Sequence, residues 1–283
     1  MQLGVYPYIA KILNRKLILF SSDSMVRVIG ISSGKGGVGK TTVATNLGIA
    51  LSNFGKRVIL VDCNLSTPHM VHYLGDTKFS KTLNDVLNGK IDITSAIYHH
   101  NGVMYVPASN DLEDLVNLDV AKLKKSIKKL SDTDMIDYIL LDSAPGLGRE
   151  AVSVLDASDE IIFVSQPLES ALTDVDRCNQ VLKEMGKKKV SLVVNMVKNK
   201  KYELKPKDIL ESVGIPIIGH IPFDKNVERA LVQKKPIVTF KPYSQVSLNY
   251  HKLAANVLGI NFKPTSGAKL FRLIDSMRDL ISS

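Results

Sequence analysis

The sequence predicts an α/β protein with a mostly parallel central sheet and helices on both faces, and three observations lead to this class. Apolar runs of strand length alternate with helix-length stretches between residues 26 and 258, as in a parallel sheet joined by crossover helices. A glycine-rich segment, 34–42, joins the first apolar run to the first helical stretch. Two further runs, 57–62 and 138–142, each end at an aspartate, and ligands bind at the carboxyl ends of parallel strands.

The composition fits one large globular domain of 283 residues, of which 45% are hydrophobic. No apolar run reaches the roughly 18–20 residues that a membrane-spanning helix needs. The formal net charge is +9, with lysines clustered at 122–129, 187–189 and 198–207. This charge favours polyanionic partners, and a solvated lysine-rich surface is the alternative for any one cluster. Two cysteines without a CxxC pair indicate a reducing compartment and argue against a cluster carrier.

The glycine-rich segment has the spacing Gly-x4-Gly-Lys-Thr of a phosphate-binding loop, between a predicted strand at 26–31 and a predicted helix at 43–54. Its backbone N–H groups must converge on phosphate oxygens, which a Cβ would obstruct. Lys40 is expected to reach the β- and γ-phosphates, and the Thr41 hydroxyl to ligate Mg²⁺. The predicted nucleotide-binding residues here are Gly34, Lys35, Gly36, Gly37, Val38, Gly39, Lys40, Thr41 and Thr42.

A second lysine, Lys35, distinguishes this segment from a general phosphate-binding loop. The string KGGVGKTT resembles the deviant Walker A loop of the MinD/ParA ATPases. In that family a lysine at this place reaches across a nucleotide-sandwich dimer to the partner's phosphates. The resemblance therefore implies ATP and Mg²⁺ as ligands, an ATP-dependent homodimer, and a catalytic role for Lys35 beside Lys40. A solvent-exposed loop lysine is the alternative.

The run 57–62 predicts a second strand, which places Asp62 at its carboxyl end. The stretch that follows resembles the family's switch I segment, although the family usually has Asp-x-Asp where this chain has Asp62-x-Asn64. An amide cannot accept a proton as a carboxylate can. We therefore expect Asp62 to orient or activate the attacking water, with Asn64 helping by a hydrogen bond. His69 and His72 are not expected to bind the metal, because Mg²⁺ prefers oxygen ligands.

The run 138–142 matches a Walker B strand, whose aspartate, Asp142, is expected to hold Mg²⁺ together with Thr41. The residues that follow, Ser-Ala-Pro-Gly at 143–146, resemble the family's switch II. Gly146 and Gly148 would let the backbone approach the γ-phosphate and move after hydrolysis.

The remaining pattern alternates strands with helices. Helices are predicted at 82–87, 119–130, 169–185 and 244–258, and strands at 102–107, 161–164, 190–195 and 216–221. The resemblance covers residues 25–260 and implies the P-loop NTPase fold. It also implies that Asn195 contacts adenine and that Pro222 and Asp224 flank it. A capping asparagine at a strand end is the alternative for Asn195.

We expect three segments: an N-terminal extension at 1–24 that the fold does not require, the ATPase domain at 25–260, and a linker with a C-terminal helix at 261–283. Residues 268–281 place apolar side chains on one helical face and charged ones on the other. This tail resembles the membrane-targeting sequence of MinD proteins. Packing on the protein body or on a partner is the alternative.

Together these features resemble most closely the MinD-type cell-division, site-determining ATPases. That resemblance implies a cytoplasmic protein that dimerises on ATP, contacts the inner face of the cell membrane through 268–283, and is released on hydrolysis. It also implies spatial positioning, such as division-site placement, and an activating protein partner. The main alternative is a ParA-type partitioning ATPase that binds non-specific DNA. A nucleotide-dependent scaffold with little hydrolysis is a further alternative, because of Asn64.

Overall fold

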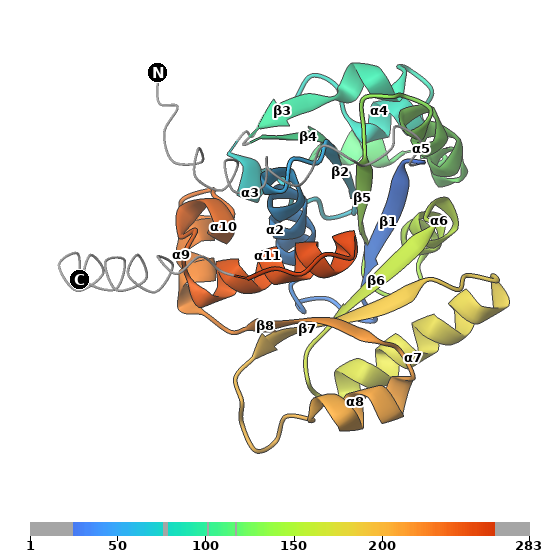
Figure 1. Cartoon of the computed structure of the whole chain (residues 1–283). Helices are drawn as coiled ribbons and strands as arrows, with labels where there is room; N and C mark the ends of the chain where they lie inside the picture. Colours follow the sequence, from blue (N-terminus) through green and yellow to red (C-terminus); the bar gives the residue numbers. More distant parts are fainter. Residues whose placement is uncertain (1–24, 76–78, 101, 117, 264–283) are drawn as a thin grey trace.

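A computed structural model describes residues 25–75, 79–100, 102–116 and 118–263 (Figure 1). The predicted extension at 1–24 and the predicted amphipathic helix at 268–281 lie outside the described residues. Within the described ranges, no helix is long and apolar enough to cross a membrane.

The described strands form one eight-stranded sheet in the order β3-β4-β2-β5-β1-β6-β7-β8. Every neighbouring pair is parallel except β3 and β4, which are antiparallel. The strands are β1 (Arg27–Ser32), β2 (Val58–Cys63), β3 (Tyr98–His100), β4 (Val103–Val106), β5 (Tyr138–Ser143), β6 (Glu160–Ser165), β7 (Val190–Val197) and β8 (Ile217–Pro222). The predicted fold class is confirmed.

The central strands are apolar throughout because helices cover both faces of the sheet. Successive residues of β2 alternate between two hydrophobic clusters: Val58 and Leu60 belong to one, and Ile59 and Val61 to the other. The first cluster includes side chains from α2 (Lys40–Asn53), α10 (Ile237–Phe240) and α11 (Gln245–Leu258). The opposite face is covered by α4 (Leu83–Leu87), α5 (Leu123–Ser131), α6 (Arg149–Ala157), α7 (Glu169–Glu184) and α8 (Pro206–Val213).

Several elements differ from the sequence-based expectation. The helix expected at 119–130 begins as a 3₁₀ turn, Val120–Lys122, and becomes α-helical only from Leu123. The strand β3 and the helices α3 (Val71–Leu74), α6, α8, α9 (Lys225–Val232) and α10 were not predicted. Most of these elements are short, and single-turn helices carry too few residues for a clear hydrophobic period.

The chain leaves the domain next to the C-terminal end of α2. Helix α11 ends at Gly259, whose φ of 69° closes it in the left-handed conformation. Beyond this cap, the ring of Phe262 lies 5.9 Å from both Phe54 and His251, measured between ring centroids. The predicted linker therefore begins with a packed residue, and the phosphate-binding loop lies at the other end of α2.

Candidate nucleotide-binding site

The glycine-rich segment forms a loop between β1 and the first residue of α2, Lys40. Gly37 and Gly39 have φ of 78° and 86°, a left-handed conformation that favours glycine. A Cβ built on Gly39 would lie 2.3 Å from the amide nitrogen of Asn195. The loop therefore needs glycine at residue 39 both for its backbone conformation and for the close approach of β7.

A cavity of about 470 Å³ opens over this loop, and that volume suits a nucleotide-sized ligand. All the predicted loop residues from Lys35 to Thr42 line it, whereas Gly34 does not line it and packs closely against Asp174. The opposite wall is made of Asn64, Thr67, His69, His72, Tyr73, Pro145, Leu231, Val232 and Lys234. The N-terminus of α2 thus points its free N–H groups and its positive dipole end into a ligand-sized space.

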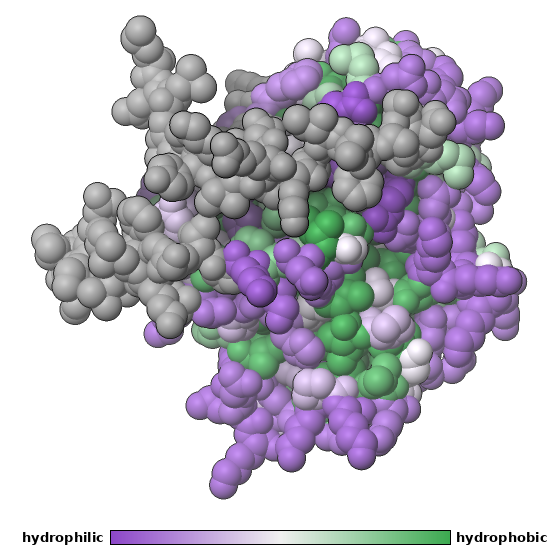
Figure 2. All heavy atoms as spheres, viewed as in Figure 1, coloured by the Kyte–Doolittle hydropathy of each residue, from purple (hydrophilic) through white to green (hydrophobic). Residues whose placement is uncertain are grey.

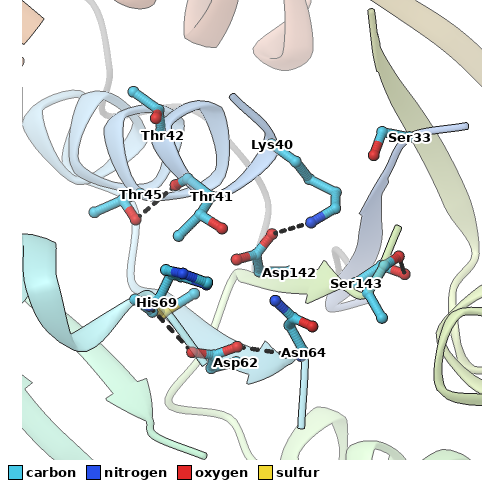
Figure 3. Close-up of polar contacts among 12 residues, drawn as sticks. Ser33, Lys40, Thr41, Thr42, Thr45, Asp62, Asn64, His69, Asp142 and Ser143 are labelled. Atoms are coloured by element: carbon cyan, nitrogen blue, oxygen red, sulfur yellow. Dashed lines mark hydrogen bonds and ion pairs between the residues drawn. The ribbon is translucent and has the colours of Figure 1, made fainter. Parts of the chain in front are cut away.

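The two strand-end aspartates are neighbours in the sheet. Asp62 pairs with Asp142 in the register of β2 and β5, and both are fully buried. The Nζ of Lys40 lies 3.5 Å from one carboxylate oxygen of Asp142 (Figure 3). The Asp62 carboxylate accepts hydrogen bonds from the backbone N–H groups of Asn64 and Met70, each at 3.1 Å. Burial, reinforced by the charge of Asp142, raises the pKa of Asp62 to about 7.

The residues at this point fit a divalent cation. The second carboxylate oxygen of Asp142 is buried and has no hydrogen-bond partner among the described residues, which is costly unless a ligand satisfies it. Thr41 lines the same cavity from the first turn of α2. A carboxylate and a hydroxyl are the hard oxygen ligands that Mg²⁺ prefers, so Asp142 and Thr41 are the residues that would hold it.

The loop after β2 is held in place by its own polar side chains. The amide nitrogen of Asn64 donates to the Thr67 carbonyl at 2.5 Å, and the Thr67 hydroxyl donates back to the Asn64 side-chain oxygen at 3.1 Å. The same Thr67 carbonyl lies 2.6 Å from the Nδ1 of His69. The Asn-x-x-Thr spacing could have indicated this local turn, but Thr67 was not predicted as a site residue.

Two contacts join the loop after β2, and the helix α3 that follows it, to other elements, and neither was predicted. The hydroxyl groups of Thr42 in α2 and Tyr73 in α3 lie 2.7 Å apart. Glu150, in the first turn of α6, accepts from the Leu65 backbone N–H at 3.1 Å and also from the Ser66 hydroxyl. Both regions that resemble switches, one after β2 and one after β5, are thus connected by a single carboxylate.

Of the predicted site residues that remain, Lys35 lines the cavity, whereas Asn195, Pro222 and Asp224 do not. The Lys35 Nζ is exposed at the rim, 3.4 Å from the Ser170 hydroxyl. The amide nitrogen of Asn195 donates to the Val38 carbonyl at 2.8 Å, so this side chain supports the loop from below. Asp224 accepts from the Asn226 backbone N–H at 2.8 Å and caps α9, directly after Pro222 ends β8. Adenine contact by Asn195, Pro222 and Asp224 stays a prediction.

A strand, a phosphate-binding loop, a helix and a Walker B aspartate in this arrangement define a P-loop NTPase. A family model described as ParA, NUBPL iron-transfer P-loop NTPase, matches residues 24–258. The chain therefore belongs to the ParA family of P-loop NTPases, as its motifs predicted.

Proteins named MinD are among the structural neighbours. The crystal structure of the cell division ATPase MinD of Pyrococcus furiosus has a TM-score of 0.79 and 33% identity, covering 83% of this chain and 99% of that one. MinD of Pyrococcus horikoshii, solved with Mg-ADP, has a TM-score of 0.78 and 33% identity, covering 82% and 96%. An uncharacterized ATP-binding protein of Methanocaldococcus jannaschii is 33% identical over 240 residues, which are 84% of this chain and 90% of that protein.

Proposed function

We propose that this chain is a MinD-like ATPase that binds Mg-ATP, dimerises, attaches to a membrane or partner, and is released on hydrolysis. Its biological output would be spatial positioning, such as division-site placement. The observation that carries this proposal is the cavity over the phosphate-binding loop, with Lys35 in its lining and, beside it, an Asp142 oxygen that has no partner in the described part of the chain. The MinD neighbours, one of them solved with Mg-ADP, support the choice of ligand.

The position of Lys35 supports an ATP-dependent homodimer. Its ammonium group is exposed and contacts only a hydroxyl of its own chain among the described residues, Ser170 at 3.4 Å. A neutral exposed partner at this distance contributes little, so the lysine can leave it without a large loss of free energy. A second copy placed over the loop would offer its ATP phosphates as a stronger partner.

The exit point of the tail supports attachment through residues 268–283. Phe262 packs at the C-terminal end of α2, whereas the phosphate-binding loop is at its N-terminal end. Fourteen helical residues span about 21 Å at 1.5 Å per residue. A membrane held by the tail would therefore leave the loop uncovered for a partner copy, and two tails per dimer would supply avidity that one weak helix lacks.

Light scattering tests the dimer. We expect the wild type to be monomeric with Mg-ADP and dimeric with Mg-ATP, and Lys35→Ala to stay monomeric while it still binds ATP. Lys125→Ala, which changes an exposed lysine of α5 outside the residues that line the cavity, is the matched control. A Lys35→Ala protein that dimerises normally would refute the assigned role of this lysine.

Sedimentation with anionic phospholipid vesicles tests the attachment. We expect binding with Mg-ATP that disappears with Mg-ADP and on deletion of residues 268–283. Undiminished ATP-dependent binding by the truncated chain would exclude the tail as the anchor.

The alternative function is DNA binding by a ParA-type partitioning ATPase. Exposed lysines gather between Lys198 and Lys207, at the hydrophilic lower end of the view in Figure 2, and such a cluster suits a phosphate backbone. The measurement is a gel shift with non-specific duplex at increasing salt. A salt-sensitive shift with ATP but not with ADP, without vesicle binding, would favour this alternative.

A further inference from the structure

The cavity wall lacks a carboxylate where hydrolysis needs a group that positions water. Among the described residues that line the cavity, none is an aspartate or a glutamate. Asn64, which does line it, has no basic group. Asp62 is fully buried, and its two oxygens accept from the backbone N–H groups of Asn64 and Met70. Its carboxylate therefore anchors the loop after β2, and Asp62 is not among the residues that line the cavity.

A side chain that can accept a proton is present in the same wall. His69 lines the cavity, is exposed, and its Nδ1 lies 2.6 Å from the Thr67 carbonyl oxygen. A carbonyl can only accept a hydrogen bond, so Nδ1 must carry the hydrogen. In the neutral imidazole, Nε2 is then the nitrogen with the free lone pair. In the view of Figure 3, the His69 ring lies between α2 and the strand that carries Asp62.

The loop network fixes this tautomer. Thr67 supplies the carbonyl that accepts from His69, and its hydroxyl donates to the Asn64 side chain. Asn64 donates to the same Thr67 carbonyl at 2.5 Å. Asn64, which stands where the family usually has a carboxylate, and His69 are thus joined through the Thr67 carbonyl. This carbonyl orients the imidazole as a backbone carbonyl orients a metal-ligating histidine.

We propose that Nε2 of His69 is the general base that takes the proton from the attacking water. This inference rests on the proposed ATPase function. The water oxygen forms a bond to the γ-phosphorus, and the bond from that phosphorus to the oxygen bridging it to the β-phosphate breaks. One water proton moves to Nε2, giving ADP, hydrogen phosphate and an imidazolium, which then releases the proton to solvent. A base that is placed in this way contributes about 10²–10⁴ in rate.

His72 is the competing candidate, because it lines the same cavity and its ring centroid lies 6.0 Å from that of His69. No hydrogen bond to a described residue fixes its tautomer, and it is not connected to Asn64. The geometry therefore favours His69, and the experiment compares both.

The experiment measures the steady-state turnover of Mg-ATP and, separately, the dissociation constant of a fluorescent ATP analogue. For His69→Ala we expect affinity within about twofold of the wild type and turnover lower by about 100-fold. Added imidazole should restore turnover in a saturable way, because it enters the space left by the missing ring. His69→Gln should be equally slow and should not respond to imidazole. His99→Ala, an exposed histidine of β3 outside the cavity, should behave as the wild type.

Three outcomes would overturn the assignment to His69. The first is unchanged turnover in His69→Ala, and the second is a loss of turnover in His69→Ala that imidazole does not restore. The third is a loss of turnover that imidazole restores in His72→Ala but not in His69→Ala. A wild type that binds the analogue but does not turn ATP over would instead overturn the ATPase proposal and this inference with it. Binding and turnover are measured separately, so the two failures are distinguishable.

Discussion

Replacing Asn195 by alanine should weaken the binding of every nucleoside triphosphate by a similar factor. Its amide donates to the Val38 carbonyl at 2.8 Å, and the residue is only 3% exposed. Removing the amide leaves a buried carbonyl of the loop without this partner, which costs about 1–3 kcal/mol. If that cost falls on the ligand-binding conformation of the loop, affinity drops by about 5- to 150-fold, since 1.4 kcal/mol is tenfold.

The assay is the dissociation constant of fluorescent ATP and GTP analogues for the wild type and Asn195→Ala. Asn256→Ala is the matched control, because its amide also donates to a carbonyl, that of Ile218, at 2.8 Å, but at an exposed place far from the loop. Equal losses for ATP and GTP are expected. A loss for ATP alone would refute the loop-support argument and favour the adenine contact that the family resemblance implies. No loss for either nucleotide would refute both.

Two further predictions follow from close contacts. A Cβ on Gly34 would lie 2.4 Å from the Cβ of Asp174 and 2.5 Å from its backbone carbonyl carbon. Gly34→Ala should therefore weaken ATP binding, measured by calorimetry, more than tenfold. Gly36→Ala is the control, because a Cβ there meets open space and should leave ATP binding unchanged. Arg27→Ala should lower the unfolding free energy by about 1–2 kcal/mol at pH 7, because Arg27 donates to both oxygens of Glu160 at 2.8 and 2.6 Å. Burial, the largest single influence, would raise the pKa of Glu160, but the hydrogen bonds and charge of Arg27, together with Lys189, outweigh it and the net pKa is lowered. The stabilisation is therefore present above about pH 4.5 and lost as the pH falls further, and melting curves at pH 7 and 3.5 should show the mutant and wild type converging.

The fold could be predicted because its determinants are local. The apolar runs at 138–142 and 57–62 are short, end at an aspartate and are separated by helical stretches, which fixes a parallel sheet without knowledge of the contacts. The glycine-rich loop carries its own spacing. In contrast, β3 is a three-residue antiparallel edge strand, Tyr98–His100, which contains two histidines. An edge strand so short and polar has no sequence pattern that separates it from a loop.

The site could be predicted only as far as its motifs extend. Lys40, Thr41 and Asp142 meet at one end of the sheet because the motif and the strand order require it. Glu150 and Tyr73 reach the same region from α6 and α3, and their partners, Ser66 and Thr42, are 84 and 31 residues distant in the chain. Contacts of that kind depend on how the helices pack, so no local spacing reveals them.

For Asp62, the sequence predicted the position of the residue but not its hydrogen-bond partners. Its position at the end of β2 was predicted, and a strand-end carboxylate beside a phosphate-binding loop suggests contact with the attacking water. The structure gives both of its oxygens to backbone N–H groups and leaves His69 in the cavity wall. Contact of Asp62 with the attacking water stays a prediction. Sequence position alone could not show which partners the carboxylate takes, because they depend on the conformation of residues 64–70.

The ion pair of Lys40 and Asp142 gives each buried charge a partner when no ligand is bound, and both groups can exchange that partner for Mg-ATP. Two buried carboxylates, Asp62 and Asp142, lie side by side with one buried ammonium, so the net charge of the three groups is negative when both aspartates are ionised. Their repulsion contributes to the raised pKa of Asp62. Mg-ATP would give Lys40 the phosphates as partners and Asp142 the cation, so each ion exchanges one opposite charge for another and neither is left unpaired. The cation would also offset the excess negative charge, so ligand binding should lower the pKa of Asp62 and keep the loop after β2 anchored by its ionised form.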